Sequence, residues 1–387
     1  MNSSNMKPRY NAVVVGARCA GAATAMLMAR SGANVLMIDW AEPGSDTMST
    51  HALMRGAVMQ LDRWGVLDQI VAADTPLVRK TTFHYGSESF AVDVKPSFGV
   101  DGLYAPRRTV LDTALVAAAT AAGVDVRFGH SFQSVRRNRE GRVSGVVIRD
   151  DRGLEHVIET DLLIGADGRR SSVARKVGAR EETVSQHATA CIYAYFQGIP
   201  DDGYRWYYDL GLAAGAIPTN DRAHCVFVAA PAETVKQARS GGAPLDALMD
   251  LATATNPTLG DELQSAHPIS KPVVFGGAHG HIRQSAGQGW ALVGDAGYFK
   301  DPLTAHGITD ALRDAEILAD LAMVGTDAAL CDYQTTRDAL ARDLFEVTDE
   351  VASFDWTLPD LQRHHRRLND VMKAEQIWMT EAFGDLP

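Results

Sequence analysis

Three residues near the start of the chain have the types and spacing needed to hold a ligand that carries phosphates. Gly16 follows a short β-branched run, Gly21 opens an alanine-rich segment, and Asp39 ends the next apolar run. A glycine turn between a strand and a helix exposes backbone N–H groups and the positive end of the helix dipole to a pyrophosphate. A carboxylate about 20 residues further on accepts hydrogen bonds from ribose hydroxyls. The spacing therefore predicts a site for the ADP half of a dinucleotide.

Arg18 departs from the usual form of this motif, because it stands where G-x-G-x-x-G has its second glycine. That glycine normally lets the backbone approach the pyrophosphate. The arginine side chain must either point away from the ligand or give its guanidinium to the phosphate. The alternative interpretation of the whole segment is an ordinary turn in a buried strand–helix–strand unit.

Two later segments place charged residues and glycines directly after apolar runs. The first contains Asp167 and Gly168, followed by several arginines, and the second contains Gly294 and Asp295. A carboxylate at a strand end either faces a ligand or caps a helix. The segment from Pro302 to Thr309 predicts a helix N-terminus, whose N–H groups and dipole favour negative charge.

The elements that must position these residues follow from apolar periodicity. We expect strands at 81–94 (a pair), 125–128, 132–136, 143–149, 156–160, 162–164, 272–275 and 290–293, and helices at 53–71, 109–122, 245–253, 309–324, 327–354 and 359–383. Aromatic and β-branched runs between residues 189 and 231 predict a separate antiparallel sheet.

Composition narrows the function classes. The chain has 387 residues, 46% of them hydrophobic, and a net charge of -11, which argues against nucleic acid as a main partner. Its four cysteines form no C-x-x-C pair and no histidines cluster with them, so neither a disulfide framework nor a metal site is expected. No apolar run reaches the roughly 18 residues needed to span a bilayer. We expect a cytoplasmic protein without a membrane span.

Together the three motifs resemble those of FAD-dependent monooxygenases of the p-hydroxybenzoate hydroxylase type. That superfamily also contains geranylgeranyl-reductase-like enzymes and flavin-dependent halogenases, and the resemblance runs from about residue 10 to 325. It implies an α/β fold in which a Rossmann-type FAD-binding domain carries an inserted antiparallel-sheet substrate domain and C-terminal helices. The corresponding ranges are 8–180 and 286–325 for the FAD-binding domain, 181–285 for the substrate domain and 326–387 for the C-terminal helices.

The resemblance also implies roles for individual residues. Asp295 holds the ribityl chain, the N–H groups at the start of the later helix hold the flavin pyrimidine edge, and Arg108 contacts the ribityl or phosphate portion. Asp167 and Gly168 serve both the FAD pyrophosphate and the nicotinamide cofactor. Val135 covers the adenine with its backbone. The expected cofactor-binding set is Gly16, Arg18, Gly21, Asp39, Arg108, Val135, Asp167, Gly168, Gly294, Asp295, Pro302, Gly307, Ile308 and Thr309.

Two histidines, His51 and His306, are brought near the flavin ring by these motifs and are the candidate catalytic residues. A pKa near neutrality would suit either for proton transfer, although a lone histidine is more often structural. His306 is favoured because it lies within the flavin loop itself.

The favoured function is a hydroxylase in which NAD(P)H reduces FAD, O2 forms a C4a-hydroperoxide, and oxygen passes to an aromatic or polyketide-like small molecule. Candidate pocket walls are Tyr193, Tyr195, Trp206, Tyr208 and Phe227, about half of which should face the opposite side of their sheet. A flavin-dependent reductase or dehydrogenase of the geranylgeranyl-reductase type is the alternative, and a non-catalytic flavin-binding protein a third. Halogenation is disfavoured because W-x-W-x-I-P is missing. We expect a monomer or homodimer.

Overall fold

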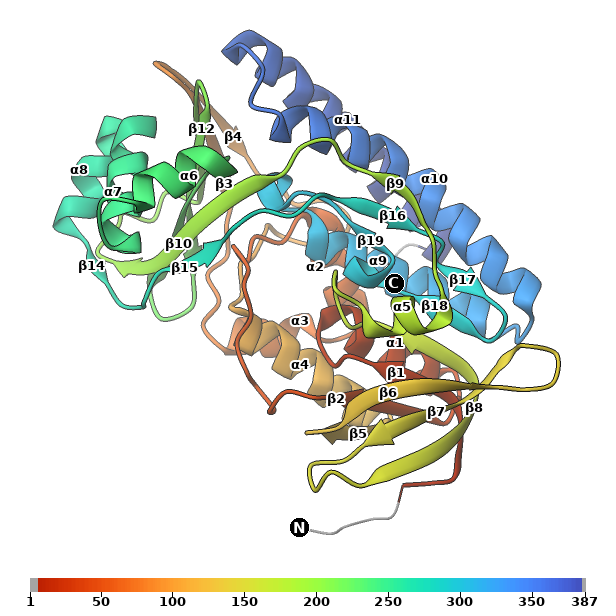
Figure 1. Ribbon diagram of the computed structural model, residues 1–387. Coiled ribbons are helices and arrows are strands. Elements are labelled where there is room, and N and C mark those ends of the chain that lie inside the picture. Colours follow the sequence, from red (N-terminus) through yellow and green to blue (C-terminus); the bar gives the residue numbers. More distant parts are fainter. Residues whose placement is uncertain (1–5, 385–387) are drawn as a thin grey trace.

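The computed structural model describes residues 6–384, which fold around two large sheets (Figure 1). The first sheet has eight strands, and its main path runs β17-β18-β8-β1-β2-β5, with β7 and then β6 added beside β8. Its strands are β1 (Arg9–Val15), β2 (Val35–Asp39), β5 (Asp125–Phe128), β6 (Ser131–Arg137), β7 (Val143–Arg149), β8 (Glu155–Gly165), β17 (Ala286–Gly287) and β18 (Trp290–Leu292).

Parallel pairing in this sheet gathers the three sequence motifs. β1 pairs in parallel with β2 and with β8, and β8 pairs in parallel with β18. The carboxyl ends of parallel strands meet at one edge of a sheet, which is where ligands bind in open α/β folds. The segments after Val15, Asp39, Gly165 and Leu292 therefore meet there, although up to 277 positions separate them along the chain, from residue 15 to residue 292.

Helix α1 (Cys19–Arg30) is buried on nearly every side, which explains its run of small residues. It packs against β1 and β2 and also against α4 (Arg108–Ala121) and α9 (Gly307–Ala322). Alanine and glycine let these helices approach closely. The opposite face of the sheet is covered by α5 (Ser172–Val177) together with the β6–β7 hairpin.

The second sheet contains two strands that the sequence-based boundaries had assigned to the FAD-binding domain. Its order is β14-β10-β13-β12-β11-β3-β4, with β15 beside β10. β3 pairs in parallel with β11, so residues 80–93 belong to this sheet. Its strands are β3 (Lys80–Tyr85), β4 (Glu88–Asp93), β10 (Thr189–Gln197), β11 (Tyr204–Asp209), β12 (Leu212–Thr219), β13 (Ala223–Pro231), β14 (His267–Pro268) and β15 (Val273–Phe275).

Both faces of this sheet are buried along strands β10 to β13, whereas the edge strand β4 is exposed. One face packs against α6 (Ala232–Arg239), α7 (Pro244–Thr255) and α8 (Pro257–Ser265). The other carries all five candidate pocket aromatics, Tyr193, Tyr195, Trp206, Tyr208 and Phe227. The expected division of these residues between the two faces was wrong. Aromatic residues that share a strand are two positions apart and so point to the same face, and the pairing of neighbouring strands places all five on one side.

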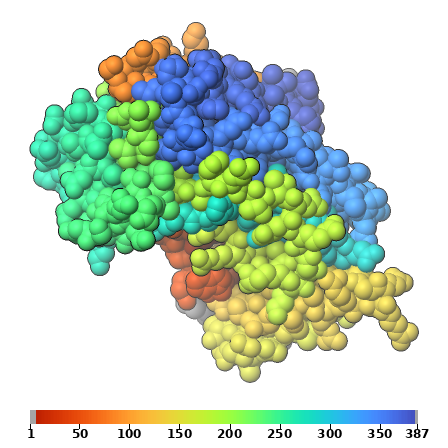
Figure 2. Space-filling model, turned by 45° about the horizontal axis from the view of Figure 1, so that its top comes forward, coloured from red at the N-terminus to blue at the C-terminus, as the bar shows by residue number. Residues whose placement is uncertain are grey.

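The remaining elements join the sheets and close the molecule. They are α2 (Arg55–Arg63), α3 (Leu67–Ala72), β9 (Glu181–Val184), β16 (His281–Arg283), η1 (Gly294–Ala296), β19 (Tyr298–Phe299), η2 (Pro302–Thr304), α10 (Asp327–Ala352) and α11 (Leu358–Phe383). The C-terminal helices, blue in Figure 2, lie beside the orange β3–β4 strands, where Tyr85 Oη is 2.6 Å from His365 Nδ1. Within residues 6–384, no helix is long and apolar enough to cross a membrane.

Candidate functional site

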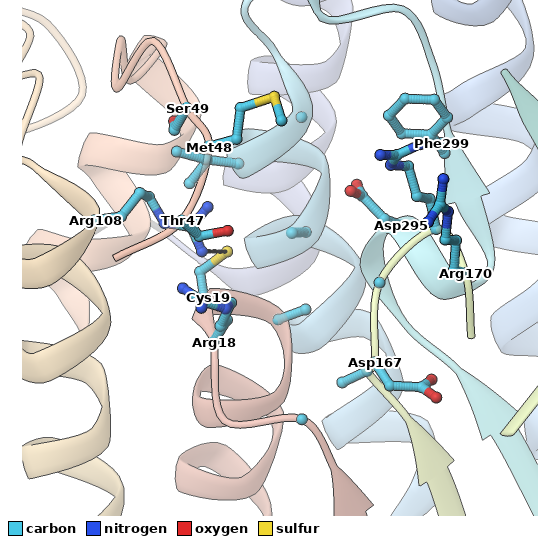
Figure 3. Close-up of a pocket in the computed structure, with 18 of the residues that line it drawn as sticks. Arg18, Cys19, Thr47, Met48, Ser49, Arg108, Asp167, Arg170, Asp295 and Phe299 are labelled. Carbon is cyan, nitrogen blue, oxygen red and sulfur yellow. Dashed lines mark hydrogen bonds between the residues drawn. The ribbon is translucent and has the colours of Figure 1, made fainter. Parts of the chain in front are cut away.

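A cavity of about 760 Å³ opens at the carboxyl edge of the first sheet and extends to the second sheet. Figure 3 shows its two walls: Arg18, Cys19, Arg108 and the loop from Thr47 to Ser49 face Asp167, Arg170, Asp295 and Phe299 across the gap. The predicted residues that line it are Gly16, Arg18, Asp39, His51, Arg108, Asp167, Gly168, Asp295, Pro302, Gly307 and Ile308.

The turn between β1 and α1 accommodates glycine alone at two positions. Gly16 has φ +110°, and a Cβ there would lie 2.3 Å from the carbonyl oxygen of Ala166. A Cβ on Gly21 would lie 1.9 Å from the carbonyl oxygen of Gly16. The first turn of α1 thus packs directly on the strand ends. Its N-terminus borders the cavity and has no side-chain cap, which leaves N–H groups for an anion.

Asp39 fixes the shape of this turn. One carboxylate oxygen accepts from the N–H of Ala17 at 2.8 Å, and the other accepts from the N–H of Ala41 at 2.8 Å. A carboxylate oxygen has two lone pairs, so both oxygens keep the capacity to accept a further hydrogen bond. The side chain lines the cavity, where a ribose is expected.

Arg18 lines the cavity but binds chiefly to protein groups. Its guanidinium lies 3.3 Å from the Asp112 carboxylate and donates to the carbonyl oxygens of Ser45, at 3.4 Å, and Asp46, at 3.2 Å. The side chain therefore ties the loop after β2 to helix α4. The sequence left open whether the Arg18 side chain points away from the ligand or toward its phosphate. In the structure the side chain is directed toward the loop after β2.

Arg108 lies beside the same carboxylate and is almost fully buried. Its Nη2 is 2.9 Å from Asp112 Oδ1 and 3.6 Å from Cys19 Sγ. Burial acts to lower the pKa of this guanidinium, but the Asp112 carboxylate outweighs it and the pKa is raised. Arg108 is a permanent cation on the cavity wall.

Asp295 offers a carboxylate whose oxygens accept no hydrogen bond from any residue within the described range 6–384. The main-chain oxygen is held by His281 Nε2 at 3.1 Å. Burial raises the pKa of the carboxyl, while Arg108, Lys300 and Arg169 act against that rise. Gly294 before it has φ +58°, and a Cβ there would lie 2.8 Å from Ala20 Cβ. An unpartnered acceptor beside cations suits a ligand with hydroxyl donors.

Asp167 reaches the cavity, yet its carboxylate is engaged with the start of α5. It accepts from Ser171 Oγ at 2.5 Å and from the N–H groups of Ser172, at 2.6 Å, and Val173, at 3.1 Å. These bonds leave the following residues, Gly168 to Arg170, as the part of the motif that faces the cavity.

The N-terminus of α9 reaches the cavity through Pro302, Gly307 and Ile308. Thr309 does not line it, because its side chain is buried against Gly56. Only the backbone N–H of Thr309 is left for the role that the sequence suggested.

The two candidate histidines are separated by the structure. His51 lines the cavity and lies 2.5 Å from Tyr195 Oη through Nε2. Burial, together with Arg108 and Arg107, lowers the pKa of His51 to about 3, so the ring is neutral at working pH. His306 does not line the cavity; its Nε2 is 2.7 Å from Glu375 Oε2 in the interface of α9 with α11. Its neighbours Ala305 and Gly307 line the cavity, but the His306 side chain points away from it, toward α11.

Val135 also lies away from the cavity. It packs in the core beneath the β6–β7 hairpin, and the start of the same segment, His130 to Phe132, lines the cavity instead. The register of β6 was not apparent from its sequence.

A buried group of charges next to the cavity was missed. Lys300 and Asp310 form an ion pair and both line the cavity, while Arg313 contacts Asp310 and Glu375. His306, Asp310 and Glu375 place ligand-type atoms within 4.8 Å of one another, but Lys300 and Arg313 already form ion pairs with the two carboxylates. No local pattern marks this group, because its members lie up to 75 positions apart, from Lys300 to Glu375.

These features fit an extended dinucleotide. The N-terminus of α1 and the Asp39 carboxylate lie at one end of the cavity, the unpartnered Asp295 carboxylate lies in the middle, and the N-terminus of α9 lies at the other end. The cavity is continuous between them.

Comparison with known proteins agrees with this assignment. The model of a family described as "FAD binding domain" matches residues 9–348. Menaquinone reductase of Mycolicibacterium smegmatis is 27% identical, with 90% of this chain and 84% of the relative covered. Digeranylgeranylglycerophospholipid reductase 1 of Methanopyrus kandleri is 27% identical, with 96% and 97% covered.

Solved structures share the fold at lower identity. The flavin-dependent brominase Bmp2 has a TM-score of 0.79 at 19% identity, with 93% of both chains covered. PqsL of P. aeruginosa in complex with 2-aminobenzoylacetate has a TM-score of 0.75 at 17% identity, with 94% of this chain and 100% of that chain covered. Because the family model spans most of the sequence, the protein belongs to the FAD binding domain family and is an FAD-dependent oxidoreductase of the superfamily that joins p-hydroxybenzoate hydroxylase-like monooxygenases, halogenases and geranylgeranyl reductases.

Proposed function

We propose that this protein is an NAD(P)H-dependent monooxygenase that hydroxylates a compact aromatic or polyketide-like molecule with O2. The observation that carries the proposal is the shape of the cavity where it reaches the second sheet. Its walls there are Cys191, Tyr193, Phe275 and Phe299, an apolar set typical of small-molecule sites.

The space beneath the rest of the sheet is filled by side chains. Tyr193 packs edge-on against Tyr195, with ring centroids 6.0 Å apart, and Trp206 packs likewise against Phe227 at 6.0 Å. Of the five aromatic wall candidates, the cavity reaches Tyr193 alone. A compact substrate fits this end better than a long chain does.

The protein residues supply binding, orientation and charge, while the flavin supplies the redox chemistry and oxygen activation. The α9 N-terminus, with Gly307 and Ile308, favours the negative charge of the reduced cofactor. Apolar side chains at this end keep water from the reacting atoms. The neutral His51 ring, which Tyr195 holds through Nε2, is buried in the wall at this end and shapes the cavity.

The nicotinamide cofactor is proposed to enter the same cavity. The sequence has one complete strand–glycine–helix motif, at Gly16 to Asp39, which the FAD would occupy. Arg169 and Arg170 line the cavity opposite that motif and are the candidate phosphate contacts. The free cysteines support our expectation of a cytoplasmic enzyme, and we expect a monomer or homodimer.

Reduction of a C=C bond is a second candidate, favoured by the names of relatives such as menaquinone reductase and digeranylgeranylglycerophospholipid reductase. Those names indicate long isoprenoid substrates. The filled space beneath the sheet argues for the first candidate.

The test is turnover of the holoenzyme with NADH or NADPH under ¹⁸O2. Phenols, aromatic polyketides and a menaquinone would be supplied one at a time, and products followed by mass. We expect one ¹⁸O atom in an aromatic product and no product without oxygen. A product that gains two hydrogens and no ¹⁸O, also under anaerobic conditions, would establish the reductase instead. Bound FAD with no turnover of NAD(P)H would indicate a non-catalytic protein.

A further inference from the structure

Behind the flavin end of the cavity lies a fully buried charge cluster made of Lys300, His306, Asp310, Arg313, Asp314 and Glu375. Arg313 donates to all three carboxylates, Asp310 at 3.2 Å, Asp314 at 2.6 Å and Glu375 at 2.5 Å. These groups come from three separate parts of the chain: the segment after β19, helix α9, and the C-terminal helix α11.

With His306 neutral, this cluster holds more carboxylates than cations. Lys300 and Arg313 face three carboxylates, burial lowers the pKa of Lys300 to about 7, and the remaining basic group is His306. Its Nε2 lies 2.7 Å from Glu375, while its Nδ1 is buried without a hydrogen-bond partner. Unbalanced charge in a dry interior is costly, so the state of this imidazole must respond to any charge placed nearby.

The groups that face His306 come from every element around it. Asp310, at 3.9 Å, and Arg313 lie on its own helix, Lys300 precedes that helix, and Glu375 faces it from α11. Helix α10 presents the neutral Thr348 to this region. Burial lowers the pKa of His306, Glu375 acts to raise it, and Lys300 and Arg313 act to lower it further.

Lys300 and Asp310 connect the cluster to the cavity, because both line it beside Gly307 and Ile308. The Asp310 carboxylate touches the ammonium through one oxygen and faces His306 through the other. A negative charge that forms at the α9 N-terminus therefore acts on His306 through one intervening ion pair. The surrounding interior screens this effect much less than water would.

We propose that His306 takes up a proton when the bound flavin is reduced, so that the cluster offsets the negative charge formed in the cavity. Two electrons and one proton convert the oxidised flavin to its anionic reduced form, and a second proton from solvent binds His306 to give an imidazolium paired with Glu375. On reoxidation both protons are released. His306 does not touch the flavin. Its positive charge acts on the flavin through the ion pair of Lys300 and Asp310, so it is a positioning residue. The inference rests on FAD binding in this cavity and not on which reaction the enzyme performs.

The test is the midpoint potential of the holoenzyme measured by spectroelectrochemistry between pH 7.0 and 8.5. For a two-electron couple each bound proton adds about 30 mV per pH unit, so we expect about 60 mV per pH unit for the unaltered protein and about 30 for Glu375→Gln. Glutamine is isosteric and still accepts from Arg313, whereas it removes the charge that supports an imidazolium. A second variant, His306→Asn, should give the same lower slope.

Two controls separate this role from a structural one. Glu316→Gln alters another buried carboxylate of α9, which accepts from Gln60 at 2.8 Å and from Trp64 at 3.2 Å, and it should keep the full slope. FAD content and thermal unfolding should show that each variant is folded. A slope of about 30 mV per pH unit in the unaltered protein would overturn the proposal. So would a full slope in Glu375→Gln or in His306→Asn, and the second result would assign the proton to Lys300.

Discussion

At the scale of single residues, Asp295 brings an unpartnered carboxylate to the middle of the cavity. We predict that Asp295→Ala weakens FAD binding tenfold to a hundredfold, because a hydrogen bond to a charged group contributes about 1.5–3 kcal/mol. Titration of the apoprotein with FAD, followed by flavin fluorescence, measures the effect. Asp338→Asn, a partly buried carboxylate paired with Arg337 on α10, is the matched control. An unchanged dissociation constant in Asp295→Ala would remove this residue from the cofactor site.

Arg18 joins the loop after β2 to helix α4 through a single guanidinium. Its bonds to the carbonyl oxygens of Ser45 and Asp46 need no cofactor. We predict that Arg18→Ala speeds amide exchange of residues 44–50 in the FAD-free protein and weakens FAD binding by about tenfold or less, the cost of a typical hydrogen bond. Exchange measured by mass spectrometry is the readout. Unaltered exchange together with weakened FAD binding would indicate a direct phosphate contact instead.

At the scale of elements, the close contact between α1 and the strand ends depends on two positions without a side chain. We predict that Gly21→Ala destabilises the apoprotein by about 1–3 kcal/mol or prevents folding, because the new methyl group would meet the carbonyl oxygen of Gly16 at 1.9 Å. Thermal unfolding and FAD content are the measurements. Gly241→Ala is the control, since no atom lies within 4 Å of the added Cβ. Equal stability of both variants would contradict this account of the turn.

At the scale of the whole molecule, several histidines are buried in their neutral form. Burial lowers the pKa to about 3 for His51, about 4 for His224, about 4 for His281 and about 3 for His365. A depressed pKa in the folded state means that the unfolded chain binds more protons below about pH 6.5. The stability is therefore fully present above that pH and is lost as the pH falls toward 4. Asp301 and Glu316, whose pKa values burial raises, act in the opposite direction.

A single variant isolates this effect. His224 is 4% exposed and neither ring nitrogen has a hydrogen-bond partner. We predict that His224→Phe reduces the loss of unfolding free energy between pH 7.5 and pH 5 by about 2 kcal/mol. Urea unfolding at the two pH values measures this difference. The exposed His267→Phe should leave the pH dependence unchanged, and an equal effect of both variants would contradict the role of burial.

Most of the helices and strands could be predicted from the sequence, because their signals are local. The helix expected at 109–122 is α4 at 108–121, and the long helices expected at 327–354 and 359–383 are α10 and α11, all three from apolar spacing. Strand β12 lies within the antiparallel sheet expected between residues 189 and 231, but its sequence LAAGAIPT is poor in the residues that mark strands and does not predict its bounds. The strands expected at 156–160 and 162–164 are one strand, β8, whose exposed Asp161 resembled a break. The glycines around α1 could also be recognised from the sequence, because a position with no room for a Cβ must be occupied by glycine.

Which residues face the cavity depends on contacts between distant parts of the chain. β3 and β4 join the second sheet through the parallel pairing of β3 with β11, more than a hundred residues away, and no local pattern reports such a partner. Thr309 and Val135 turn into the core, and His306 turns toward Glu375, although the motif places all three near the flavin. A motif fixes the path of the backbone. The direction of each side chain depends on what packs against it, and for His306 that is a carboxylate supplied by the last helix of the chain.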